Sequence, residues 1–172
     1  MSDALHQARL HFSQGIEAVN AGRLTDAEQL FGQALQLAPD RPSILTNLGV
    51  VRVRLGRCAE ALPLLERAAA QEADNLEAWV HLGMARAALG QLAAALSAFD
   101  HALAQRADLA QAWVHRGSAL RELGRHAEAA ASFERAIALG ADDDLVRYYL
   151  ASVRNGDAPA APPRAYVQDL FD

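Results

Sequence analysis

The sequence contains no lysine, only one cysteine and no long apolar run, and each of these features excludes certain classes of function. All 16 basic residues are arginine and the formal net charge is -5, which excludes a Schiff-base lysine and the lysine of a phosphate-binding loop. No basic block could neutralise a row of phosphates, so we expect no nucleic-acid partner. Cys58 cannot form an internal disulfide, in keeping with a reducing cytoplasm.

Membrane-directing segments are also missing. No stretch approaches the roughly 18 consecutive apolar residues that a membrane helix needs, and the first residues have neither the cationic start nor the apolar centre of a secretory signal. We therefore expect a cytoplasmic chain without a membrane partner.

Residues that favour strands are scarce. Runs of valine, isoleucine and threonine are rare, whereas alanine, the strongest helix former, is the most frequent residue type. With 52% hydrophobic residues in 172, the chain can build one domain or a short stack of repeats. An all-α fold follows.

A shift of 34 residues aligns the chain with itself, which is the sequence signature of a repeat architecture. Small or bulky residues recur in columns that are kept through four units. These columns are Gly15, Gly49, Gly83 and Gly117; Gly22, Gly56, Gly90 and Gly124; Ala27, Ala61, Ala95 and Ala129; Phe31, Leu65, Phe99 and Phe133; Ala34, Ala68, Ala102 and Ala136; and Asp40, Asp74, Asp108 and Asp142.

Each column predicts a structural role. The Gly15 column lies inside a helix, where glycine is costly unless a neighbouring helix must approach closely. The Gly22 column is placed to end that helix with a left-handed residue. The Asp40 column precedes each new helix, where a carboxylate can cap free N–H groups. The repeating unit is therefore a helix, a tight turn and a second helix.

The columns resemble the tetratricopeptide repeat, whose pattern of an aromatic residue, Leu-Gly, Ala, Phe, Ala and Pro is visible here. Trp79 to Gly83 and Trp113 to Gly117 carry its opening, and Phe31, Ala34 and Pro39 carry its close in the first unit. The pattern is broken at several positions, for example at Arg116 in place of leucine. The resemblance implies a right-handed superhelical solenoid of four antiparallel helix pairs plus a C-terminal capping helix.

We expect the solenoid to occupy residues 1–156. Its repeats are expected at about 8–41, 42–75, 76–109 and 110–143, followed by an amphipathic capping helix at about 142–155 that covers the last repeat. Residues 157–172 form a proline-containing linker and an apolar tail.

Chemistry-bearing residues do not form a recognisable catalytic site. None of the 6 histidines belongs to a His-Glu-x-x-His pattern. Asp142, Asp143 and Asp144 could in principle bind calcium, although three acids at a helix start more often form a cap. No glycine-rich nucleotide loop or nucleophile–base–acid set is present. We expect no metal, no cofactor and no enzymatic activity in this chain.

One polar column points instead to binding. Ser13, Asn47, His81 and His115 recur at the same position of the four first helices. A buried column of four polar residues would be costly without partners, so an exposed position explains it better. In the resembled family this column matches the asparagines with which some members, including O-linked sugar transferases, hold a peptide backbone. We interpret it as a mixed polar ladder on a concave groove that binds a protein or peptide; the alternative is an ordinary hydrated surface.

Helical phase places an apolar strip with few charges around the ladder, and exposed apolar surface of that kind often marks a partner site. The expected groove residues besides the ladder are Phe12, Ile16, Val50, Arg54, Val80, Met84, Val114 and Arg121. The basic clamp of chaperone-binding relatives is not expected, because only Asn47 of its positions matches.

The last residues suggest a second interpretation. Residues 165–172 resemble the segment that joins tetratricopeptide repeats to a methyltransferase domain dependent on S-adenosylmethionine in some bacterial proteins. This chain would then be the N-terminal module of a longer enzyme, and reading the gene beyond Asp172 distinguishes that case from a free-standing adaptor. The tail is also a candidate for self-association through the groove; the alternatives are a disordered tail and one that awaits a catalytic domain.

Overall fold

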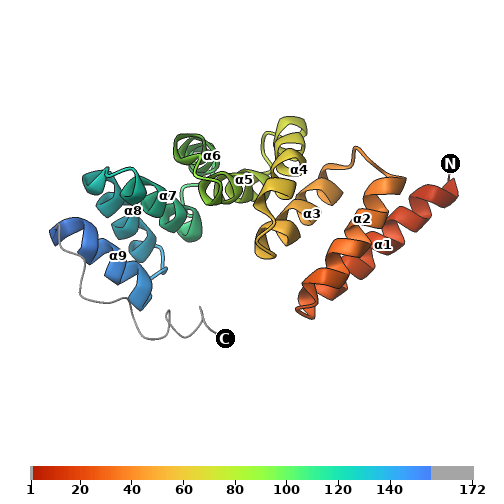
Figure 1. Ribbon diagram of the computed structural model, residues 1–172, viewed down its shortest axis with the longest axis horizontal. Coiled ribbons are helices and arrows are strands. Elements are labelled where there is room, and N and C mark those ends of the chain that lie inside the picture. The colour runs from red at the N-terminus through yellow and green to blue at the C-terminus, as the bar shows by residue number, and fades with distance from the viewer. Residues whose placement is uncertain (1, 156–172) are drawn as a thin grey trace. The chain divides into compact units, whose positions relative to one another are not determined.

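The computed structural model describes residues 2–155, and within that range the chain contains nine helices and no strand (Figure 1). The all-helical prediction is confirmed. The helices are α1 (Ser2–Asn20), α2 (Leu24–Leu37), α3 (Pro42–Arg54), α4 (Cys58–Gln71), α5 (Leu76–Ala88), α6 (Leu92–Gln105), α7 (Ala110–Glu122), α8 (His126–Ala138) and α9 (Asp144–Asn155). None of the helices in this range is long and apolar enough to span a bilayer.

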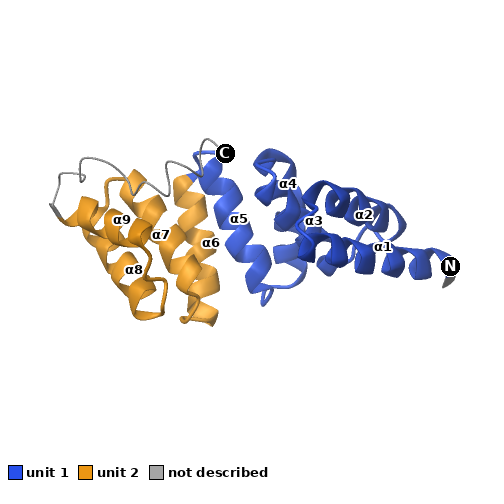
Figure 2. Ribbon diagram, turned by 90° about the horizontal axis from the view of Figure 1, so that it is seen from below, with its two compact units in different colours: residues 1–91 blue, residues 92–172 orange. Residues whose placement is uncertain are grey.

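The described helices form two compact units (Figure 2). In the first, residues 2–91, α1 packs on α2, α3 on α4, and α5 on both α3 and α4. In the second, residues 92–155, α6 packs on α7, α7 on α8, and α9 on α8 and α7. The third sequence repeat is thus divided, with α5 in one unit and α6 in the other.

Tight turns at the glycine column separate the two helices of each repeat. Gly22, Gly56, Gly90 and Gly124 have φ between 73° and 75°, a conformation that costs other residues about 1–2 kcal/mol. At each turn the next N–H bonds to a carbonyl five residues back, as from Arg23 to Ala18. The predicted left-handed ends of the first helices are confirmed.

Close helix contacts explain the other glycine column. A Cβ atom on Gly15 would lie 2.5 Å from the Phe31 ring, and one on Gly117 would lie 2.7 Å from the Phe133 ring. Both rings are completely buried. Glycine at this position therefore lets the first helix of the pair rest directly on the bulky residue of the second, as predicted.

The aspartate column does not cap the first helices, and this prediction is wrong. The residues at the N-cap positions of α3, α5 and α7 are Arg41, Asn75 and Leu109, and of these only Asn75 accepts a side-chain hydrogen bond, from the Ala78 N–H at 3.0 Å. The aspartates stand one residue too early. Asp40 instead accepts a bond from Arg67 on α4 at 2.9 Å.

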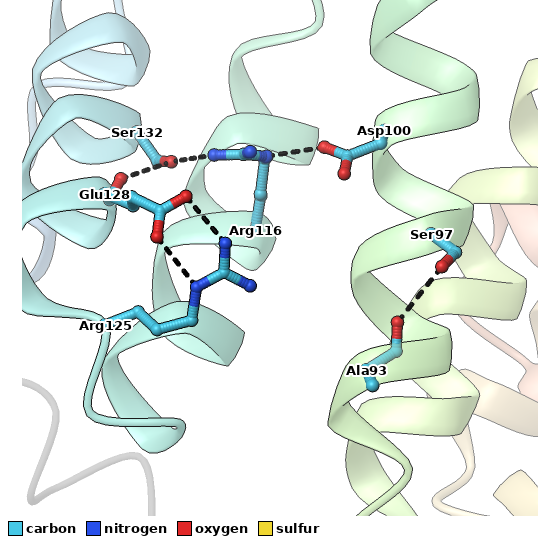
Figure 3. Close-up of polar contacts among 7 residues, drawn as sticks. All are labelled: Ala93, Ser97, Asp100, Arg116, Arg125, Glu128 and Ser132. Carbon is cyan, nitrogen blue, oxygen red and sulfur yellow. Dashed lines mark hydrogen bonds and ion pairs between the residues drawn. The ribbon is translucent and has the colours of Figure 1, made fainter.

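Arg116, which replaces a leucine of the repeat pattern, links three helices of the second unit (Figure 3). Its guanidinium donates to Asp100 on α6 at 2.7 Å and to Ser132 on α8 at 2.8 Å. Ser132 is completely buried, and its hydroxyl donates to the Glu128 carbonyl at 2.9 Å. Beside them, hydrogen bonds from Arg125 hold the pKa of the Glu128 carboxyl below its ordinary value.

Helix α9 covers the fourth pair with an apolar face. Val146 and Val153 are buried, and the Tyr149 ring lies 5.8 Å from that of Phe133. The acidic run before α9 acts as a cap, because the Asp143 carboxylate accepts from the Val146 N–H at 2.8 Å. Arg147 donates hydrogen bonds to the Asp142 carboxylate, and these bonds lower the pKa of the Asp142 carboxyl.

Candidate peptide-binding surface

The twelve residues predicted to bind a partner are divided between the two units. Nine of them belong to the first unit, on α1, α3 and α5: Phe12, Ser13, Ile16, Asn47, Val50, Arg54, Val80, His81 and Met84. Three lie on α7 of the second unit: Val114, His115 and Arg121. None of the twelve is fully buried, so each unit presents its own part of the predicted surface.

The three ladder residues of the first unit share one local geometry. Ser13 Oγ donates to the Leu10 carbonyl at 2.9 Å, and Asn47 Nδ2 donates to the Ser43 carbonyl at 2.8 Å. His81 Nδ1 lies 2.9 Å from the Glu77 carbonyl, and because a carbonyl oxygen only accepts, Nδ1 carries the proton. Each side chain therefore uses a donor on its own helix, and its other polar atoms have no partner among residues 2–155.

The fourth ladder residue sits in a different environment. His115 is half-buried and stacks on Phe99 of α6, with ring centroids 6.0 Å apart and planes inclined by 17°. Arg121 lies over the Tyr149 ring at 4.1 Å, so its cation contacts the capping helix. Val114 is half-buried. In the second unit these side chains are thus partly engaged with α6 and α9.

The apolar members of the first unit are half-buried, whereas Arg54 is exposed. Phe12 packs against the buried cluster of Ala8, Ala34, Ala38 and Ile44, and its ring centroid lies 5.5 Å from that of Phe31. One side of the ring therefore belongs to the core and the other remains accessible.

A hollow of about 200 Å³ opens beside Phe12. Residues of α1, of the α2–α3 loop and of the start of α3 line it: Leu5, Ala8, Arg9, Phe12, Ala38, Arg41, Ser43 and Ile44. Ser43 is also the residue whose carbonyl accepts from Asn47, so one residue that lines the hollow contacts the ladder. Sequence reasoning missed the contributions of Leu5 and Arg41, because a loop residue and a residue ahead of the first repeat carry no periodic signal.

A sequence model of one family matches three overlapping stretches of the chain. The model is described as "Tetratricopeptide repeat", and it matches residues 12–57, 46–110 and 81–144. Together these stretches span most of the sequence. The chain belongs to the tetratricopeptide repeat family.

Solved tetratricopeptide structures show the same fold. A crystal structure of MamA protein aligns over 91% of this chain and 84% of its own, with a TM-score of 0.79 and 20% identity. YrrB, described as a TPR protein with an unusual peptide-binding site, aligns over 81% and 72% with a TM-score of 0.74 and 27% identity. A thermophilic TPR protein of Thermus thermophilus, TTC0263, aligns over 85% and 80% with a TM-score of 0.71 and 27% identity. No curated protein sequence matches the chain significantly.

The two tryptophans of the tetratricopeptide pattern have the same role in the two units. Trp79 Nε1 donates to the Ala73 carbonyl, and Trp113 Nε1 donates to the Ala107 carbonyl, both at 3.0 Å. Each bond attaches a first helix to the loop that precedes it. The ladder residues His81 and His115 stand two positions further along these helices.

Within residues 2–155 no three His, Cys, Asp or Glu side chains gather in a way that could hold a metal ion. Residues 157–172, where the linker, the tail and the junction with a methyltransferase domain are predicted, lie outside the described part of the chain.

Proposed function

We propose that this tetratricopeptide chain is a protein-interaction module that binds an extended peptide along its first helices. The observation that carries the proposal is the shared geometry of Ser13, Asn47 and His81. Each of these side chains donates to a carbonyl of its own helix and has other polar atoms with no protein partner among the described residues.

The remaining polar atoms are mainly acceptors. The bond to Ser43 leaves the Oδ1 of Asn47, and Ser13 keeps its lone pairs. The bond to Glu77 leaves the Nε2 of the His81 tautomer that has its proton on Nδ1. Acceptors at one equivalent position of successive helices suit the N–H groups of an extended backbone. Main-chain bonds of this kind provide affinity with little dependence on the peptide sequence.

Half-buried side chains beside the ladder supply the apolar part of the interaction. Ile16, Val50, Val80 and Met84 have apolar surface that is only partly covered, and methionine adapts readily to different partners. The description of YrrB as a peptide-binding TPR protein, at 27% identity, supports the same role for this chain. That this chain is the N-terminal part of a longer methyltransferase remains a separate prediction.

Selection from a random peptide library on the full chain, followed by titration of one selected peptide, tests the proposal. Asn47→Ala is expected to weaken binding by about 1 kcal/mol or more, because a backbone N–H of the bound peptide loses its acceptor. The fold is expected to persist, since Asn47 is only half-buried.

A serine outside the ladder provides a matched control for Ser13. Ser97 on α6 makes the same kind of bond as Ser13, from its Oγ to the Ala93 carbonyl at 3.2 Å (Figure 3), but it lies on a second helix. Ser13→Ala should therefore weaken peptide binding and Ser97→Ala should not. Equal effects of the two substitutions, or loss of folding in Asn47→Ala, would show that the ladder is structural.

A further inference from the structure

The hollow beside Phe12 combines an apolar floor with two arginines. Ala8, Ala38 and Ile44 form its buried part, while the Leu5 side chain is 38% exposed at its edge. A cavity of about 150 Å³ holds a benzene ring, so a hollow of about 200 Å³ has room for one large apolar side chain. A small number of well-placed polar groups around an apolar floor is typical of ligand sites.

Arg9 and Arg41 line this hollow, and within residues 2–155 neither forms an ion pair. Arg41 directly follows Asp40, but that carboxylate is bound by Arg67 of α4 at 2.9 Å. Asp3 lies in an adjoining hollow with Arg9 and forms no ion pair with it. The chain as a whole is acidic, with a formal charge of -5, so two guanidinium groups at one apolar hollow that form no ion pair with any residue of the described range are a local exception.

Exposed leucines extend the apolar surface around the hollow. Leu5 lines it, and Leu37, 38% exposed, lines the adjoining hollow together with Leu5 and Arg41. Leucines at tetratricopeptide turns, such as Leu89 and Leu123, are exposed to a similar degree but line neither of these two hollows. A cluster of apolar residues with a charged rim marks a partner site more specifically than a single exposed leucine does.

We propose that this hollow, the anchor pocket, binds a large apolar side chain of a partner peptide whose neighbouring residue carries a carboxylate. The apolar side chain fills the floor, and the carboxylate accepts hydrogen bonds from Arg9 and Arg41, whose planar guanidinium groups suit a carboxylate. The inference rests on the proposed function, because it takes the ligand to be a peptide. It adds which peptides bind: those with a large apolar side chain next to a carboxylate.

A labelled peptide with the sequence of residues 165–172 and an amidated end serves as the probe, because its Asp-Leu-Phe-Asp segment has this chemistry. Binding is measured by fluorescence anisotropy on the full chain carrying Leu170→Ser and Phe171→Ser, so that the chain's own segment does not compete. We expect the probe to bind, and a version with both aspartates replaced by asparagine to bind at least about threefold more weakly. The affinity should also fall as salt is added.

Substitutions in the anchor pocket have matched controls. Arg9→Gln and Arg41→Gln should each weaken binding at least about threefold. Arg135→Gln should not, because Arg135 is an exposed arginine of α8 that lies outside the hollow. Leu5→Ser should weaken binding and Leu10→Ser should not, since Leu10 is 43% exposed on the same helix but does not line the hollow. Circular dichroism confirms that each variant is folded.

The outcomes separate this inference from the proposed function. If Arg9→Gln and Arg41→Gln weaken binding while Asn47→Ala does not, the anchor pocket stands and the ladder fails; the reverse result overturns the anchor pocket. Equal affinity for the acidic and the neutral peptide also overturns it. If the chain with its natural residues 165–172 binds the probe more weakly than the serine variant, the ligand is the chain's own segment and the partner peptide is rejected.

Discussion

Arg116 Nε donates to a carboxylate oxygen of Asp100 at 2.7 Å, and the same guanidinium reaches the buried hydroxyl of Ser132 (Figure 3). The position of Arg116 is one where the tetratricopeptide pattern has leucine. The polar substitution is therefore accompanied by two polar partners on the neighbouring helices. Hydrogen bonds join α6, α7 and α8 at a position where the second and third repeats have the buried Leu48 and Leu82.

Arg116→Ala is accordingly expected to lower the free energy of unfolding by about 1–2 kcal/mol, because Asp100 and Ser132 both lose a charged donor. Arg125→Ala serves as the control, because its bonds to Glu128 are exposed and local and solvent-exposed pairs of this kind contribute little to stability. Urea unfolding measures both. A double-mutant cycle with Ser132→Ala should give a coupling of about 0.5 kcal/mol or more, and additive effects would contradict the link to α8.

Gly15→Ala and Gly32→Ala are the same chemical change in two helices and should have opposite effects. A Cβ atom at position 15 would overlap the Phe31 ring, and we expect a loss of about 1–3 kcal/mol despite the gain in helix propensity. At Gly32 no atom lies within 4 Å of the added Cβ, so alanine should stabilise α2 by about 0.5–1 kcal/mol. Thermal unfolding of the two variants compares the signs directly.

Asn75→Ala is expected to destabilise the chain by about 1 kcal/mol, because the Ala78 N–H at the start of α5 loses its cap. The substitution also removes the Asn75 bond to the buried Thr46 hydroxyl at 3.0 Å. Asp74→Ala, at the adjacent aspartate of the repeat column, should change stability by less than about 0.5 kcal/mol. Urea unfolding measures both variants. Similar losses of stability at the two positions would show that Asp74 also caps α5.

Removal of residues 142–172 is expected to lower stability by about 3 kcal/mol or more and to promote association. It takes away the buried Val146 and Val153 and leaves the Phe133 ring without Tyr149. A shorter deletion of residues 157–172 retains α9 and provides the control. Calorimetry and light scattering measure the two effects; a monomeric protein with an unchanged melting temperature after the larger deletion would exclude a capping role for α9.

The repeat and its helices were predictable because they depend on local rules. Glycine at Gly22 and its equivalents is required by a backbone with positive φ. The glycine that precedes it in the first helix is required by a bulky residue 16 positions later, as at Gly15, Gly49 and Gly117. Both constraints recur with the period of the repeat, so they appear in the sequence as columns. The polar ladder is visible for the same reason.

The sequence by itself therefore determined the helical repeat and its turns, and it placed the ladder residues at one position of the first helices. Only the tertiary structure decided which polar groups meet: that Asp40 binds Arg67 while Asn75 caps α5, that Arg121 lies on Tyr149, and that Arg9 and Arg41 line one hollow. The physical reason is that a long arginine side chain reaches acids on several neighbouring helices, and its choice among them depends on packing distances that no periodic pattern encodes.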